Sequence, residues 1–111
     1  MARVSIKTQL VFNKLPELRG QVRRRAADAV TKAAFDVEAQ AKALAPVDTG
    51  ALKSSIQAQP EGDLAARVDV GAEYGIYVEF GTRKMRAQPF LEPAAEQVKP
   101  SFEAAMRQVA G

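Results

Sequence analysis

The chain has 111 residues, enough for one compact domain, and its 47% of hydrophobic residues can build a core without tryptophan. Cysteine and histidine are both absent, which excludes a disulfide framework, thiolate or imidazole metal sites, and the commonest general base of enzymes. Positive charge is concentrated before residue 33 and negative charge between residues 33 and 82, so the net charge of +3 conceals a polarised molecule.

The first part of the chain predicts a strand and then a long helix. Apolar and polar residues alternate over residues 4–12, which is typical of a half-buried strand. A helical pattern follows, either continuous or divided near Gly20, and Pro46 should end it because the residue before a proline avoids helical dihedral angles. A helix over residues 16–44 would be about 40 Å long, enough to span the domain. The predicted stripe consists of Leu15, Leu18, Val22, Ala26, Ala29, Val30, Ala33, Val37, Ala41 and Leu44.

The middle of the chain predicts a short capped turn and a hairpin. Asp48 is placed to cap a turn that begins at Thr49. Residues 56–59 and 64–70 flank the sequence Pro-Glu-Gly-Asp, a strong turn signal. Apolar residues at 66, 68 and 70 alternate with charged ones, so we expect an antiparallel hairpin with these three side chains facing inward.

The last part predicts two helices joined by a basic loop. Tyr74, Tyr77 and Val78 have helical spacing, and Gly81 should close that turn. The loop 82–88 should lie on the surface, because buried unpaired charges are very costly. Pro93 can open a final helix, in which Pro100 predicts either a kink or a split. We therefore expect one α+β domain over residues 1–111, with a small antiparallel sheet packed against one long helix and a C-terminal helix.

Few residues indicate chemistry. The glycines form no phosphate-binding pattern, and no apolar run approaches the roughly 20 residues that span a membrane. Glu61 and Asp63 are better explained as a solvated hairpin tip than as part of a calcium loop, and Asp48 as a cap than as a nucleophile. We predict no catalytic, cofactor-binding or metal-binding residue. A small enzyme of the carboxylate type stays a minor alternative.

Clustered cations and aromatic residues suggest contacts with a partner. Arg19, Arg23, Arg24 and Arg25 resemble a nucleic-acid footprint, but no aromatic residues interleave to stack on bases, so a partner-facing helix side is favoured. Arg83, Lys84 and Arg86 allow the same two interpretations, and Met85 between them is adaptable enough to fill a partner's pocket. Tyr74, Tyr77, Phe80 and Phe90 are expected mainly in the core, although exposed phenol ends could bind a partner.

Three phrases, in this order after a long helix, resemble a known family. They are APVDTGALKSSI at 45–56, YGIYVEFGT at 74–82 and QPFLEPA at 88–94. Together they are similar to the head–tail joining or tail-completion proteins (neck or minor tail proteins) of long-tailed bacteriophages and prophages. The resemblance covers residues 15–111. The residues that carry it are Pro46, Asp48, Thr49, Gly50, Leu52, Tyr74, Tyr77, Glu79, Phe80, Gly81, Thr82, Pro89, Phe90 and Pro93.

The resemblance implies a structural part of the virion, not an enzyme, made in the bacterial host cytoplasm. Such proteins assemble as a ring, sixfold by resemblance, where the tail meets the portal-bearing capsid. The implied partners are other copies of the chain and neighbouring head-completion, tail-terminator or tail-tube proteins, with no cofactor, membrane or sequence-specific nucleic acid. The candidate interface residues are Arg23, Arg24, Arg83, Lys84, Met85 and Arg86. A small basic nucleic-acid-binding module is the alternative, and a steep salt dependence of DNA affinity would identify it.

Overall fold

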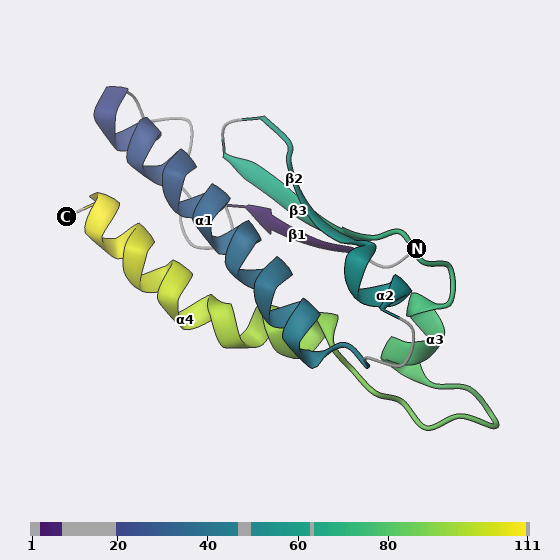
Figure 1. The fold of residues 1–111 in the computed structure, drawn as a ribbon. Helices are drawn as coiled ribbons and strands as arrows, with labels where there is room; N and C mark the ends of the chain where they lie inside the picture. The colour runs from purple at the N-terminus through teal and green to yellow at the C-terminus, as the bar shows by residue number, and fades with distance from the viewer. Residues whose placement is uncertain (1–2, 8–19, 47–49, 63, 111) are drawn as a thin grey trace.

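The computed structural model describes residues 3–7, 20–46, 50–62 and 64–110. A three-stranded antiparallel sheet with the order β1-β3-β2 packs against the two long helices α1 and α4 (Figure 1). This confirms the predicted α+β class, with a small sheet, one long helix and a C-terminal helix. The elements in chain order are β1 (Arg3–Lys7), α1 (Gly20–Leu44), α2 (Ala51–Ser54), β2 (Ile56–Pro60), β3 (Ala65–Val70), α3 (Gly75–Phe80) and α4 (Leu91–Ala110).

The helix α1 is built around a stripe of small buried residues. Alanine and valine dominate that stripe, so the α1 backbone can lie close to its neighbours, and α4 runs antiparallel beside it (Figure 1). The helix ends at Leu44, two residues before Pro46, as expected. Val22 and Leu44 were predicted in the stripe but are exposed, because they lie in the first and last turns of α1, away from its alanine-rich middle. The buried residues are Ala26, Val30, Ala33, Ala34, Val37 and Ala41.

The central strand β3 fixes the register of the sheet. Val68 lies opposite Ala58 of β2 and opposite Val4 of β1. Along β3, Ala66, Val68 and Val70 are buried while the residues between them are half-buried, which confirms the predicted hairpin and its inward face. The strand β2 lies at an edge of the sheet, where the Ala58 N–H donates to Glu38 Oε1 of α1 at 2.6 Å. This bond satisfies an edge donor and ties the helix to the sheet.

The outward face of the hairpin carries a small ionic network. Arg67 donates to Asp69 Oδ2 at 2.8 Å and to Glu61 Oε1 at 2.7 Å. The hydrogen bond to Asp69, and to a smaller extent the one to Glu61, raises the pKa of the Arg67 guanidinium above its usual value. Gly62, at φ 80°, supplies the left-handed turn residue. Residues 8–12 of the predicted first strand, residues 13–19 of the predicted helix and Asp63 lie outside the described residues.

The C-terminal helix α4 is continuous through Pro100, so of the two alternatives predicted there, a kink or a split into two helices, the split is wrong. Pro100 is exposed and removes one hydrogen bond, whereas the buried stripe on both sides of it packs into the same core. Burial of those side chains outweighs the local cost of the proline. Pro93 lies in the first turn of α4, where its missing N–H costs nothing. The buried stripe contains Leu91, Ala94, Val98, Phe102 and Met106.

The molecule is elongated, with extents of 50 × 19 × 19 Å and a radius of gyration of 15.2 Å, against about 13 Å expected for a compact chain of this length. The first turn of the helix α1 and the last turn of the helix α4 lie together at one end of the molecule (Figure 1). We call this the terminal end, after these two helix termini. The helix α3 and the segment that follows it lie at the other, the α3 end. Among the helices that the structure describes, none is both long and apolar enough to cross a membrane.

Candidate assembly interface

The short helix α3 contacts the core through a glycine. A Cβ on Gly75 would lie 2.7 Å from Val70 Cγ1 and 3.4 Å from Leu52 Cδ1. The backbone of α3 therefore sits directly on the end of β3 and on α2, at a distance that only glycine allows. Because Gly75 and Glu79 are the buried residues of α3 and lie four positions apart, they define its inward face.

The aromatic residues of this region face away from the core. Tyr74, Tyr77 and Phe80 are 41%, 55% and 68% exposed, so the expectation that they lie in the core is wrong. The reason is geometric, since their spacing of three places them on the side of α3 opposite to Gly75 and Glu79. Phe90, which follows the loop, is fully buried as expected.

Glu79 joins α3 to the start of α4. Its Oε1 accepts from the Phe90 N–H at 3.1 Å and from the Leu91 N–H at 2.9 Å, and its Oε2 accepts from the Glu92 N–H at 3.1 Å. The first N–H groups of a helix have no partner within the helix, and a negative charge there is favoured by the helix dipole. Glu79 is only 5% exposed, so these bonds form away from water. Glu79 was predicted as a family-motif residue without a role, and the structure places it as a side-chain cap.

The segment 82–89 folds back on α3. Gly81, at φ 76°, closes α3, and a Cβ there would lie 2.8 Å from the backbone nitrogen of Ala87. The Thr82 N–H donates to the Met85 carbonyl at 2.8 Å, and Thr82 Oγ1 accepts from the Met85 N–H at 3.0 Å. The Gln88 N–H donates to the Val78 carbonyl at 2.8 Å. All eight side chains of this segment are exposed, which confirms its predicted surface position.

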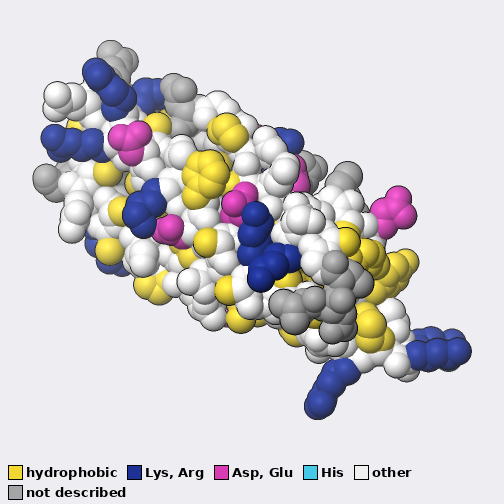
Figure 2. Space-filling model, viewed as in Figure 1, with side chains coloured by type: hydrophobic (Ala, Val, Ile, Leu, Met, Phe, Trp, Pro, Cys, Tyr) yellow, Lys and Arg dark blue, Asp and Glu magenta, His cyan; other side chains and the backbone are white. Residues whose placement is uncertain are grey.

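The α3 end therefore presents an apolar surface bordered by cations, which we call the α3 surface. Figure 2 shows hydrophobic side chains gathered at this end and basic side chains projecting beyond them. Tyrosine and arginine are enriched among the residues that dominate binding energy in protein interfaces. The α3 surface consists of Tyr74, Ile76, Tyr77, Phe80 and Met85, with Arg83, Lys84 and Arg86.

The predicted interface residues form two separate groups. Arg83, Lys84, Met85 and Arg86 belong to the α3 surface, whereas Arg23 and Arg24 are exposed near the start of α1, at the terminal end. The two groups of cations are therefore at opposite ends of the molecule, and no single contact with a compact partner can use both.

The remaining motif residues surround α2 and the start of α4. Leu52 is buried, while Pro46 and Pro93 are half-buried and Pro89 is exposed. Gly50, at φ 71°, occupies the position before α2, which begins at Ala51. Asp48 and Thr49, and with them the predicted aspartate cap, lie outside the described residues.

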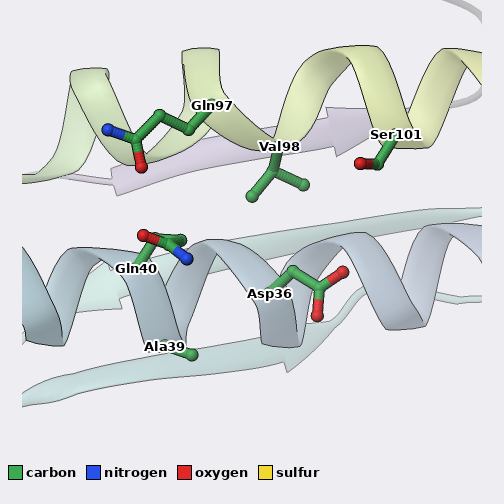
Figure 3. A pocket seen from close by; sticks show the side chains of 6 residues that line it. All are labelled: Asp36, Ala39, Gln40, Gln97, Val98 and Ser101. Atoms are coloured by element: carbon green, nitrogen blue, oxygen red, sulfur yellow. The ribbon is translucent and has the colours of Figure 1, made fainter.

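A small surface groove lies between the packed helices α1 and α4 (Figure 3). It has a volume of about 190 Å³, and its one carboxylate, Asp36, accepts from Lys32 Nζ at 2.7 Å. The described ranges of the chain contain no group of three acidic side chains that could hold a metal ion. The groove is lined by Asp36, Ala39, Gln40, Gln97, Val98 and Ser101.

One exposed aromatic residue was not anticipated. Phe35 lies in the middle of α1 and is 53% exposed, on the side that faces away from the core. The sequence did contain a signal for this exposure, because Phe35 lies outside the apolar stripe of an amphipathic helix. Asp28 and Asp36 lie within two turns of Phe35 on the same helix, and Glu38 follows.

Comparison with known proteins gives one match. The model of the family described as "Bacteriophage HK97-gp10, putative tail-component" matches residues 10–81. No curated protein and no solved structure matches the chain. The matched range includes α1, the hairpin and all of α3.

Proposed function

Because the chain belongs to the HK97-gp10-like family of bacteriophage tail components, we propose that it is a structural protein of the phage neck. In this proposal, copies of the chain form a ring, sixfold by the family resemblance, that completes the tail and joins it to the capsid portal. A tail component is part of the virion, and this one is made in the host cytoplasm before assembly. Its partners are other copies of itself and the adjacent head-completion, tail-terminator or tail-tube proteins.

The α3 surface is the observation that supports an assembly role. Monomeric proteins rarely expose large contiguous apolar surfaces unless these bind something. Here Tyr77 and Phe80 are more than half exposed, yet Gly75 and Glu79 hold their helix firmly on the core. A rigid helix with exposed aromatic residues is preorganised for binding and loses little conformational entropy when a partner covers it.

The proposal assigns no turnover to the chain. Carboxylates such as Asp69 and Glu79 are engaged in structural bonds, to Arg67 and to the start of α4 respectively. Replacing either one should affect folding or assembly only. Reproducible hydrolase or nuclease activity that disappeared with one carboxylate, while the fold survived, would contradict the structural role.

Complementation of a phage that lacks this gene tests the proposal. Without the chain, lysates viewed by electron microscopy should contain filled capsids and separate tails, and infectivity should fall by several orders of magnitude. The wild-type chain supplied from a plasmid should restore joined particles. Joined, infectious particles in the absence of the chain would refute the neck role.

A double variant addresses the α3 surface in the same assay. Tyr77→Ser with Phe80→Ser should fold normally but fail to restore joining, because the change removes exposed apolar area and nothing from the core. Leu44→Ser is the matched control, since Leu44 is also an exposed apolar side chain but lies outside the α3 surface. Full restoration by the double variant would exclude the α3 surface from the assembly role.

A further inference from the structure

We propose that neighbouring copies of the chain associate through two different surfaces, with the α3 surface of one copy placed on the outward side of α1 around Phe35 of the next. We call this second surface the Phe35 face and define it by Asp28, Lys32, Phe35 and Asp36. The inference rests on the ring of the proposed function and names the two surfaces that would build it.

The Phe35 face offers an apolar centre within a polar surrounding. Phe35 is more than half exposed, and the other residues of the face are charged. Figure 2 shows this kind of surface along the body of the molecule, where separate hydrophobic side chains lie among charged ones. Contact with aromatic residues from another copy would remove Phe35 from water and pair ring with ring, an arrangement that stabilises interfaces beyond the area buried.

The charges of the two surfaces are complementary. The α3 surface has three cations, whereas the Phe35 face has two carboxylates and one lysine. Glu38, in the next turn of α1, is half-buried and already bonds the Ala58 N–H and Lys42, so it is not part of this face. Lys32 already bonds Asp36, but Lys32 is exposed and Asp36 only half-buried, so that pair is weak and an arginine from a neighbour can share the carboxylate. Asp28 is exposed and available as well. Opposite charges of this kind steer docking and fix its register.

Two alternative contacts between copies bring like charges together, one symmetrical and one head-to-tail. Two α3 surfaces facing each other would oppose Arg83, Lys84 and Arg86 to the same residues of the second copy. Docking of the α3 end on the terminal end would oppose them to Arg24 and Arg25, which are exposed there. Like charges placed opposite one another suppress association.

The size of the contact is modest. Aromatic side chains bury about 150–250 Å² each, and an interface of standard size buries about 800 Å² on each partner. The aromatic side chains of the α3 surface are 41–68% exposed, so each adds only part of its area, and the contact is smaller than the standard size. Because the two surfaces differ, each added copy leaves one surface of each kind open, and only a closed ring uses both on every copy.

Cross-linking in assembled tails tests the inference, because the chain has no cysteine and engineered ones are unique. The test variant combines Lys84→Cys on the α3 surface with Ala39→Cys, an exposed position one turn beyond Phe35. A short thiol-specific bifunctional reagent applied to tails carrying this variant should give a ladder of covalent oligomers of the chain. Each single variant should stay monomeric. The matched control, Lys84→Cys with Gln108→Cys at the terminal end, should give no ladder.

Two results would overturn the inference. Dimers of the Lys84→Cys single variant would indicate a two-fold contact between α3 surfaces. A double variant that stays monomeric in assembled tails would show that the α3 surface does not meet the Phe35 face. A double variant joined only to a different tail protein would show that this other protein covers the α3 surface.

Phe35→Asp separates this inference from the proposed function. The variant should fold, since Phe35 is exposed, but should abolish the ladder in the two-cysteine background and reduce head–tail joining at least tenfold. Normal joining by Phe35→Asp would refute the Phe35 face while leaving the neck role intact. Joining without any copy of the chain would instead refute the neck role.

Discussion

The body of the molecule and its α3 end use apolar residues in opposite ways. In the body, α1, β3 and α4 direct their periodic apolar side chains inward, onto one core. At the α3 end, a glycine and a carboxylate face inward while aromatic side chains face solvent. An element that buries Gly75 and Glu79 and exposes Tyr77 and Phe80 gains little of its own stability from the aromatic residues. Their placement is instead suited to a partner.

The sharpest test of this difference compares two charge insertions. Val68→Asp would bury an unpaired charge in the central strand, with a cost of several kcal/mol, enough to unfold a small domain. Phe80→Asp should leave the thermal unfolding midpoint nearly unchanged, because Phe80 is exposed in the free chain. Circular dichroism melting curves of both variants measure this. A midpoint for Val68→Asp equal to that of the wild type would contradict the inward face of β3.

The Glu79 cap links the two regions, and its loss should cause the next largest decrease in the free energy of unfolding. Glu79→Ala leaves three N–H groups at the start of α4 without their acceptor, and we expect a loss of about 3 kcal/mol in the free energy of unfolding. Glu79→Gln keeps one side-chain oxygen and should lose less. Denaturant titration gives the energies, and hydrogen exchange should show faster exchange of the amides of residues 90–92. Unchanged exchange in Glu79→Ala would rule out the cap.

The approach of α3 to the body can be tested with two glycines. Gly75→Ala places a Cβ 2.7 Å from Val70 Cγ1, and overpacking of this kind costs about 1–3 kcal/mol. Gly71→Ala is the matched control, because the nearest atom to its Cβ would be at 3.6 Å, an ordinary contact. Equal unfolding free energies for the two variants would mean that α3 is not held as closely as described.

The smallest effect is expected at the terminal end. Arg24→Ser with Arg25→Ser changes only exposed side chains, so stability should stay within about 0.5 kcal/mol of wild type. DNA affinity of the purified chain should be weak and little altered by the double change. A strong affinity that fell steeply with salt and was lost in this variant would favour the nucleic-acid-binding alternative.

Sequence patterns predicted the body well because its structure depends on local periodicity. The alternation around Val68 and the stop before Pro46 are each set within a few residues. Of the two outcomes predicted at Pro100, a kink or a split, the split did not occur, because the burial of Phe102 and Met106 against distant elements outweighs a local preference. Local patterns carry no information about such tertiary packing.

The α3 end was predicted only in part, for a related reason. Its glycine-closed turn and exposed basic loop were anticipated, but the orientation of Tyr77 and Phe80 depends on which face of a six-residue helix meets the core. The role of Glu79 depends on bonds to residues 11–13 positions later, beyond the reach of helical spacing. The exposure of Phe35 was readable in principle from its position outside the apolar stripe, but no sequence pattern indicated what it would contact.

The Glu79 cap also offers a short mechanical path through the molecule. Because the carboxylate accepts from the N–H groups of residues 90–92, a displacement of α3 is passed to the start of α4 through these bonds as well as through the covalent segment 82–89. The helix α4 extends about 30 Å along the long axis beside α1. The side chains that α1 and α4 bury in one core then resist such a displacement together, along the length of the two helices.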